Sequence, residues 1–244
     1  MDPAAYIEMA AVESRHWWFT GRRAIITAVL EQLHLPNNAR ILEIGCGTGG
    51  NLDMLAAFGT VSAFDMEESA RAIASKKTGG VYDIRAGHCP DQIPFSGERF
   101  DLICMFDVLE HIEHDEETLT AIRGMLTENG RVLLTIPAFE WLYGVHDDFM
   151  HHHRRYSSRE IKRKIKGGGY RLARLSYFNT LLFPLAATVR LKERLFGSTH
   201  AAGTAVPPAP VNRLLQKIFA AERTWLKRFN FPFGVSLLCI LEAG

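Results

Sequence analysis

The segment ILEIGCGTGGNL, residues 41–52, constrains the fold of this chain more than any other. It runs from a short apolar stretch through a glycine cluster into an amphipathic stretch. Glycine lets a backbone turn tightly and approach a ligand without a Cβ in the way. Gly45, Gly47 and Gly50 satisfy the dinucleotide pattern G-x-G-x-x-G, and replacing Gly50 by Gly49 gives the shorter G-x-G-x-G. Both patterns predict a strand, a tight turn and a helix around a nucleotide-type ligand.

The same alternation of strand and helix continues far beyond the glycine cluster. Short apolar runs typical of strands are separated by amphipathic stretches typical of helices. The expected strands cover residues 40–45, 60–65, 81–87, 100–107 and 131–137, with two more at 170–179 and 234–243. Strands that alternate with helices predict a parallel sheet with helices on both faces, a doubly wound α/β fold.

Composition excludes several classes of protein. The chain has 244 residues and a formal net charge of +1, which argues against a general binder of nucleic acid. Its four cysteines form no C-x-x-C pair, so we expect neither a disulfide framework nor a zinc ribbon. The first residues lack the basic flank and apolar run of a signal peptide, and no apolar run is long enough to span a bilayer. We therefore expect a cytoplasmic protein.

Asp65 follows the second expected strand, about 20 residues after the glycine cluster, where an acidic residue can bind ribose hydroxyls. Nicotinamide oxidoreductases and methyltransferases both use such an acid. Glu43 lies two positions before the first glycine and has no role in pyrophosphate binding. Its presence favours the second class, and an NAD(P)-dependent oxidoreductase or a non-catalytic cofactor-binding protein remains as an alternative.

Taken together, LEIGCGTG, the acid after the second strand, RFDLICMFDVLEHI and GRVLLTIP resemble the class I S-adenosylmethionine-dependent methyltransferases. The resemblance covers about Arg40 to Pro137. It implies a Rossmann-like sheet of seven strands, one of them antiparallel, which the segment 234–243 would supply. It also implies S-adenosyl-L-methionine as cofactor and an enzyme that transfers a methyl group.

The resemblance assigns roles to individual residues. Glu43 would organise the loop, Asp65 would bind the ribose diol, and Met66 would cover one face of the adenine. His88 stands where the family usually has an acidic residue that meets the adenine amino group. The expected cofactor-binding residues of this core are Glu43, Gly45, Cys46, Gly47, Asp65, Met66, His88 and Phe106.

The ends of the chain resemble a bacterial subgroup of the same class, through HWWF..RR near the N-terminus and a GHxRRY-like HHHRRY. That subgroup is linked with glycan and lipid pathways, so we expect a small-molecule acceptor or one linked to lipid or glycan. Residues 1–38 would form a helical lid on the cofactor. Trp18 would pack on it, and Arg22 would pair with its carboxylate.

The whole chain, 1–244, is expected to form one methyltransferase domain. Its core would comprise residues 39–179 and 233–244, and residues 180–232 would form an α-helical insertion before the last strand. The insertion could act as a substrate cap, as an interface between two copies of the chain, or as a peripheral membrane contact at the inner face. The segment 180–196 suits the last role because it joins apolar residues to Arg190, Lys192 and Arg194.

The segment DDFMHHHRRYSSRE, residues 147–160, is expected to face the acceptor, because loops after the fourth and fifth strands meet over the cofactor. The main hypothesis makes His152 or His111 a base for an oxygen acceptor, assisted by Tyr156. The groups expected to bind the acceptor are His153, Arg154 and Arg155. The plainer alternative is that the histidine rings pair with neighbouring aspartates.

A divalent metal is the third interpretation of these residues. Asp107, Glu110 and His111 follow the fourth strand as D-x-x-E-H, and His152 follows the fifth. Ubiquinone-pathway and small-RNA methyltransferases carry a comparable E-x-x-E-H. Two carboxylates and two imidazoles could hold a cation that polarises an acceptor. We do not favour this alternative, because D-V-L-E-H-I also occurs in class I methyltransferases that use no metal.

Overall fold

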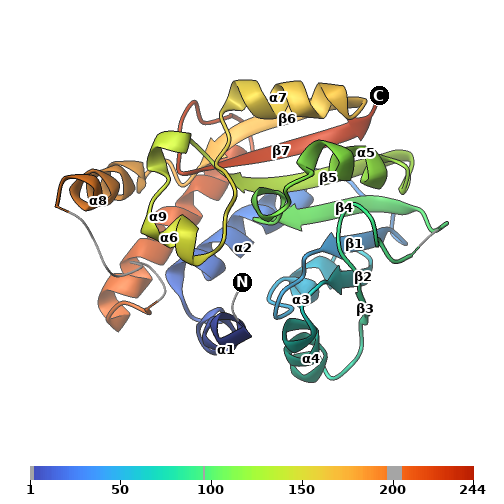
Figure 1. Cartoon of the computed structure of the whole chain (residues 1–244), viewed down its shortest axis with the longest axis horizontal. Helices are drawn as coiled ribbons and strands as arrows, with labels where there is room; N and C mark the ends of the chain where they lie inside the picture. The colour runs from blue at the N-terminus through green and yellow to red at the C-terminus, as the bar shows by residue number, and fades with distance from the viewer. Residues whose placement is uncertain (1–2, 96, 197–204) are drawn as a thin grey trace.

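A computed structural model describes residues 3–95, 97–196 and 205–244. Its centre is a sheet of seven strands in the order β3-β2-β1-β4-β5-β7-β6 (Figure 1). The strands are β1 (Arg40–Ile44), β2 (Thr60–Asp65), β3 (Asp83–Ala86), β4 (Phe100–Phe106), β5 (Leu126–Pro137), β6 (Tyr170–Phe178) and β7 (Ser236–Ala243).

The sheet is mixed because of its last strand. Strands β1 to β5 pair in parallel, and β7 runs antiparallel to both β5 and β6, with Leu134 opposite Cys239. The expected seven-stranded α/β fold with one antiparallel strand is confirmed. The central strands are buried on both faces, which explains why they appear in the sequence as continuous apolar runs.

Helices connect the strands and surround the sheet. They are α1 (Pro3–Val12), α2 (Trp17–Leu30), α3 (Leu52–Ala56), α4 (Glu68–Lys77), η1 (Leu109–His111), α5 (Asp115–Arg123), η2 (Glu140–Leu142), α6 (Val145–Phe149), α7 (Ser158–Gly167), α8 (Phe183–Phe196) and α9 (Ala209–Leu226). Along the residues that the structure describes, no helix combines the length and apolarity needed to cross a bilayer.

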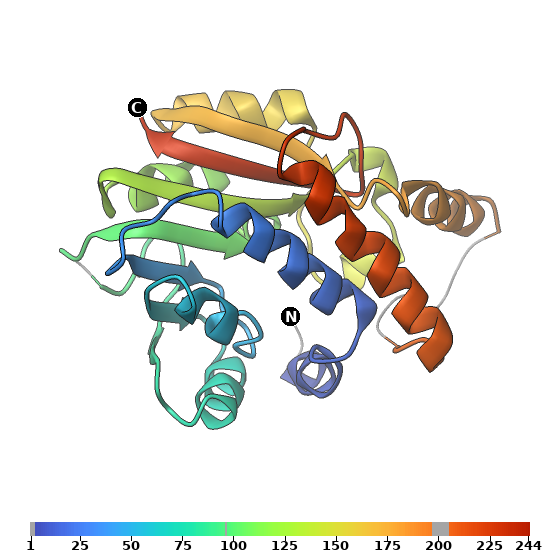
Figure 2. The same ribbon diagram turned by 180° about the vertical axis from the view of Figure 1, so that it is seen from behind.

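Two apolar cores lie on opposite faces of the sheet. Helices α5 and α7 pack on one face, seen in front in Figure 1. Helices α2, α3 and α9 pack on the other, and Figure 2 shows α2 and α9 side by side there. Each helix presents apolar residues at helical spacing to the sheet, which is the arrangement that the alternating sequence predicts.

The prediction that residues 1–38 form a lid needs correction for α2, the second helix of that segment. Helix α2 begins at Trp17, where the ring Nδ1 of His16 accepts a hydrogen bond from Trp18 N at 3.2 Å. Its apolar face, which includes Ile25 and Val29, is completely buried against the sheet. Helix α2 is therefore part of the core, because an apolar face of that width needs a permanent partner.

Two further differences concern connections. The fifth strand was expected at 131–137, but β5 already begins at Leu126, and residues 128–130 lie within it beside a register shift opposite Phe100 and Leu102. The predicted insertion, 180–232, contains α8 and α9, and its residues 197–204 lie outside the described part of the chain. Helix α9 packs against α2 rather than standing apart from the core.

Candidate active site

A cavity of about 1010 Å³ opens where β1, β2, β4 and β5 end. Its wall is built from the glycine loop, from α1 and α2, from the segment after β4, from the loop with the histidine cluster and from α8. These segments are far apart in the chain. They meet because the carboxyl ends of neighbouring parallel strands lie at one edge of a doubly wound sheet.

The glycine loop adopts a backbone that other residues would strain. Gly45 and Gly47 have φ of +67° and +52°. A Cβ on Gly45 would approach Val108 Cγ2 to 2.7 Å, so only glycine fits there. Gly47 N donates a hydrogen bond to Asp65 Oδ2 at 2.8 Å, which ties the loop to the end of β2.

The residues expected to bind ribose and adenine lie around this loop. Asp65 is 6% exposed, and its Oδ1 accepts a hydrogen bond from Glu67 N at 2.9 Å. Burial raises the pKa of Asp65. Met66 is 74% exposed, and Cys46, His88 and Phe106 contribute to the cavity wall as well. A shielded acid beside exposed apolar surface fits the adenosine part of the cofactor that the resemblance implies.

Glu43 does not line the cavity but lies beneath the glycine loop. Its Oε1 accepts a hydrogen bond from Asn51 Nδ2 at 2.8 Å, and its Oε2 has no hydrogen-bond partner within the described part of the chain. Burial raises the pKa of this carboxyl to about 8. Asn51 lies at the start of α3, so its hydrogen bond to Glu43 joins β1 to that helix. This contact is consistent with the expectation that Glu43 organises the glycine loop.

Trp18 and Arg22 both reach the cavity from α2, but each already has a protein partner. The Trp18 ring stacks on Phe219 at 5.1 Å between centroids. Nη1 of Arg22 forms an ion pair with Oδ2 of Asp107, at the end of β4. The cofactor carboxylate predicted to bind Arg22 would therefore share that guanidinium with Asp107.

Glu110, His111 and His152 meet on the side of the cavity formed by the segments after β4 and β5. The two imidazole rings lie 4.6 Å apart, edge to face. One potential ligand atom from each of the three residues lies within 4.8 Å of the others. Asp107 is not in this group, because Arg22 and Thr135 hold its carboxylate. The predicted four-residue metal set is thus reduced to three.

The protonation of Glu110 and His111 follows from their burial. Glu110 is completely buried, and neither of its carboxylate oxygens has a hydrogen-bond partner among the described residues. Burial, and then the charge of Asp107, raise its pKa well above the usual value. Burial, and then His152, lower the pKa of His111 to about 4, so its ring is neutral at pH 7. A neutral imidazole such as that of His111 can bind a cation.

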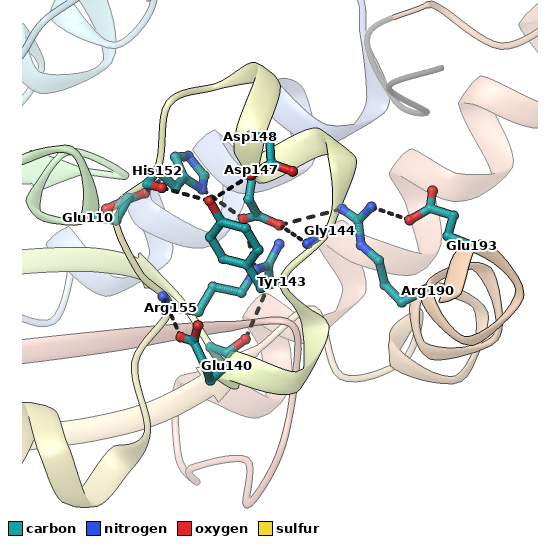
Figure 3. Close-up of polar contacts among 11 residues, drawn as sticks. Glu110, Glu140, Tyr143, Gly144, Asp147, Asp148, His152, Arg155, Arg190 and Glu193 are labelled. Atoms are coloured by element: carbon teal, nitrogen blue, oxygen red, sulfur yellow. Dashed lines mark hydrogen bonds and ion pairs between the residues drawn. The ribbon is translucent and has the colours of Figure 1, made fainter. Parts of the chain in front are cut away.

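His152 is fixed by a second layer of charged groups (Figure 3). Its Nδ1 lies 2.8 Å from Oδ1 of Asp147, the same oxygen that Arg155 Nε reaches at 2.8 Å. Asp147 is the neighbour that the plainer interpretation of the cluster selected. His152 pairs with Asp147 and also lines the cavity. The plainer interpretation and the functional one are therefore compatible.

Of the other residues predicted to act on the acceptor, two line the cavity and two do not. His153 lines the cavity, and Arg155 also lines it while bound to Asp147. Arg154 instead pairs with Asp115 at 3.0 Å and is not part of the cavity wall. Tyr156 is fully buried, and its hydroxyl donates to Asp115 Oδ2 at 2.9 Å. Their positions argue against the predicted acceptor contact of Arg154 and the predicted catalytic role of Tyr156.

The sequence predicted a lid from residues 1–38 and a possible cap from residues 180–232, but it named no residue of α1 or α8 as part of the cavity wall. Tyr6 and Met9 of α1 and Val189 and Arg190 of α8 line it. Helix α1 is anchored by Glu13, whose Oε1 accepts hydrogen bonds from Thr48 and from Lys77. No local pattern marks these contacts, since each depends on a partner distant in the chain.

Comparison with known proteins agrees with the geometry. Residues 15–175 match a family described as a methyltransferase domain. An uncharacterized methyltransferase of Staphylococcus carnosus is 36% identical over 116 residues, which cover 46% of this chain and 54% of that protein. A dTDP-3-amino-3,6-dideoxy-alpha-D-glucopyranose N,N-dimethyltransferase of Streptomyces fradiae is 34% identical over 104 residues, 41% of this chain and 39% of that protein.

A ubiquinone biosynthesis O-methyltransferase of Schizosaccharomyces pombe is 27% identical over 128 residues, 49% of this chain and 46% of that protein. The chain thus spans about half the length of the curated relatives it matches.

Solved structures share the fold over more of the chain. A protein described as a methyltransferase from Bacillus halodurans has a TM-score of 0.60 and 19% identity, covering 89% of this chain and 98% of its own. An S-adenosylmethionine-dependent methyltransferase from Clostridium acetobutylicum has a TM-score of 0.58 and 13% identity, covering 91% and 90%. The ambiguity of the glycine pattern is resolved in favour of S-adenosylmethionine. The chain belongs to the methyltransferase domain family and has the Rossmann-like fold of the class I S-adenosylmethionine-dependent methyltransferases.

Proposed function

We propose that the protein transfers a methyl group from S-adenosylmethionine to a hydroxyl oxygen of a small-molecule or lipid- or glycan-linked acceptor. The observation that carries this proposal is the placement of His152 at the cavity, with one ring nitrogen on Asp147 and the other 4.0 Å from Glu110 Oε1. When bound, the cofactor supplies an electrophilic methyl group on a sulfonium. A hydroxyl acceptor must lose its proton as the new bond forms, which a neutral imidazole beside it can accept.

His152 is the better of the two predicted bases. The low pKa of His111 makes that ring a weak base, because protonation would place a charge in a buried site beside His152. His152 instead is held through Nδ1 by Asp147 Oδ1 at 2.8 Å, which fixes the direction of its ring. The enzyme's other contribution is to position the acceptor in line with the methyl group and to exclude water.

The far side of the cavity supports an acceptor with an apolar portion. Apolar side chains from η2, from α6 and from α8 with the residue before it face the cavity, namely Leu142, Phe149, Leu182, Leu185, Ala186 and Val189. The likeness of HWWF and HHHRRY to a subgroup linked with lipid and glycan pathways supports the same class. The curated relatives include enzymes named for methyl transfer to oxygen and to nitrogen. The choice of oxygen as the methylated atom is therefore based on the geometry of His152.

The test supplies methyl-labelled S-adenosylmethionine with three acceptors: a catechol bearing a polyprenyl chain, the same catechol without the chain, and a dTDP-linked amino sugar. We expect label in the chain-bearing catechol and release of S-adenosylhomocysteine, both lost in His152→Ala and kept in His34→Gln. His34 is exposed and does not line the cavity. Label in the amino sugar would move the reaction to nitrogen. No turnover of any acceptor by a protein that binds S-adenosylhomocysteine would reject the proposed acceptor classes.

A metal-assisted O-methyl transfer is the second candidate, and the compact set of Glu110, His111 and His152 favours it. These residues would hold a divalent cation, which would polarise the acceptor hydroxyl. Calorimetric titration with Mg²⁺, Mn²⁺ and Zn²⁺ in turn tests this. A binding heat that Glu110→Gln abolishes supports the metal, and its absence for all three ions leaves His152 acting as a base alone.

We further propose peripheral membrane contact through 180–196. Leu191 and Leu195 are exposed on α8 beside the basic Lys192 and Arg194, a combination that suits an anionic bilayer surface. Cosedimentation with vesicles of phosphatidylglycerol, against vesicles of phosphatidylcholine, tests the contact. A dimer seen by sedimentation without vesicle binding would assign α8 to an interface between copies instead.

A further inference from the structure

Asp147 is a fully buried carboxylate that is contacted by groups from its own loop and from α8. Its Oδ2 accepts a hydrogen bond from Gly144 N at 3.0 Å and lies 4.0 Å from Arg190 Nη2 of α8. Its Oδ1 is shared by Arg155 Nε and His152 Nδ1. Figure 3 shows Asp147 between His152 on one side and Arg190, itself paired with Glu193, on the other.

The hydrogen bonds of Asp147 decide which nitrogen of His152 carries a proton. Its Oδ1 accepts a hydrogen bond from Arg155 Nε at 2.8 Å, and its Oδ2 accepts one from Gly144 N at 3.0 Å. A carboxylate paired with a guanidinium only accepts hydrogen bonds. Because the same Oδ1 lies 2.8 Å from His152 Nδ1, a neutral ring here carries its proton on Nδ1, which leaves a lone pair on Nε2.

The other ring nitrogen faces Glu110, which lines the cavity together with His152. Nε2 of His152 lies 4.0 Å from Glu110 Oε1, and the His111 ring lies against the imidazole. The backbone is held as well, since Tyr143 Oη donates to the carbonyl of His152 at 2.9 Å. The titratable and charged groups around this imidazole are Glu110, His111, His146, Asp147, Arg155 and Arg190.

We propose that Asp147 is a positioning residue that fixes His152 as the Nδ1–H tautomer and keeps the Nε2 lone pair facing the acceptor. The inference rests on the proposed role of His152, and it serves both candidate mechanisms, because a base and a metal ligand each need a free Nε2. Through Arg190, the same carboxylate connects α8 to this geometry.

A structural role alone would predict something different. Asp147 also caps α6 through Gly144 N, so its loss destabilises the loop whatever the histidine does. A helix cap places no demand on which nitrogen of His152 carries the proton. The tautomer therefore separates positioning from capping.

The experiment is ¹⁵N NMR of protein labelled at its histidines, above pH 7, with the His152 signals assigned by their loss in His152→Gln. We expect the wild-type ring to give a pyridine-type Nε2 and a pyrrole-type Nδ1. In folded Asp147→Ala the two types should exchange, since an unconstrained imidazole prefers the Nε2–H form. Asp83→Ala, a change at an exposed position of β3, should leave the wild-type pattern.

An Nε2–H tautomer in the wild type, or an unchanged pattern in folded Asp147→Ala, would overturn the proposal. If Asp147→Ala does not fold, the wild-type spectrum alone decides, because it needs no variant of Asp147. The measurement uses no acceptor. A wrong acceptor class would leave the spectrum as expected, so failure of the proposed function and failure of this inference are distinguishable.

Discussion

Arg22 of α2 and Asp107 at the end of β4 form an ion pair in the wall of the cavity, 85 positions apart in the sequence. The pair joins the N-terminal helices to the strand that supplies the Glu110 cluster. Both side chains are largely buried, at 9% and 22% exposed. The same Asp107 accepts a hydrogen bond from Thr135 Oγ1, which extends the link to β5.

Replacing Arg22 should weaken cofactor binding. Arg22→Ala removes the guanidinium that is expected to pair with the cofactor carboxylate and leaves Asp107 without its charged partner. Loss of one charge-assisted hydrogen bond corresponds to about 1.5–3 kcal/mol, or roughly a 10- to 100-fold rise in Kd for S-adenosylhomocysteine. Calorimetry measures it, with the exposed Arg15→Ala as control. An unchanged Kd would show that Arg22 serves only to hold Asp107.

Replacing Asp65 should also weaken cofactor binding. Thermal unfolding without ligand separates this loss of binding from the loss of stability that the same change causes. Asp65→Ala removes the acceptor expected for the ribose diol, so Kd should rise by about 10- to 100-fold. It also frees Gly47 N and Glu67 N, which lowers the Tm without ligand. Asp83→Ala, at an exposed position of β3, should change neither quantity. A fall in Tm with an unaltered Kd would contradict the ribose contact.

The sequence predicted the parts of the fold that depend on local pattern. Gly45 and Gly47 identify the turn after β1 because only glycine tolerates their backbone, and no distant information is needed. Alternating apolar and amphipathic segments likewise predicted the parallel sheet with helices on both faces, whereas the antiparallel direction of β7 was implied only by the resemblance to class I methyltransferases.

The site could be predicted only in outline. The position of the segments after β4 and β5 follows from topology, so the meeting of Glu110, His111 and His152 was predictable. The partners of Tyr156 and Asp107 were not, because Asp115 and Arg22 reach them across 41 and 85 positions. Sequence periodicity shows that a face will be buried but does not show what covers it.

Gly21 should tolerate no side chain, because α2 and α9 touch there. A Cβ on Gly21 would approach Phe219 Cδ1 to 2.6 Å, and Phe219 is fully buried. Overpacking of this kind costs about 1–3 kcal/mol, which lowers the Tm of a chain of this size by roughly 2–12 °C. Gly167→Ala in α7 meets nothing within 4 Å and should be neutral or slightly stabilising. Equal effects of the two changes would mean that α9 does not pack on α2.

Glu43 should make stability depend on pH in a direction opposite to that of an ordinary salt-bridged acid. Burial raises its pKa from 4.5 to about 8, so the folded chain holds the proton more tightly than the unfolded chain. The resulting stabilisation is complete below about pH 4.5 and is lost as the pH rises through about 8.

Glu43→Gln mimics the protonated carboxyl, so it should match the wild type in Tm near pH 5 and exceed it increasingly toward about pH 9. Thermal unfolding across that range measures the difference between the two proteins, which cancels the titration of the other groups. The exposed Glu128→Gln is the matched control and should give a difference that does not vary with pH. A constant difference for Glu43→Gln would mean that Glu43 is ionised in the folded protein, with a counter-charge or water reaching its Oε2.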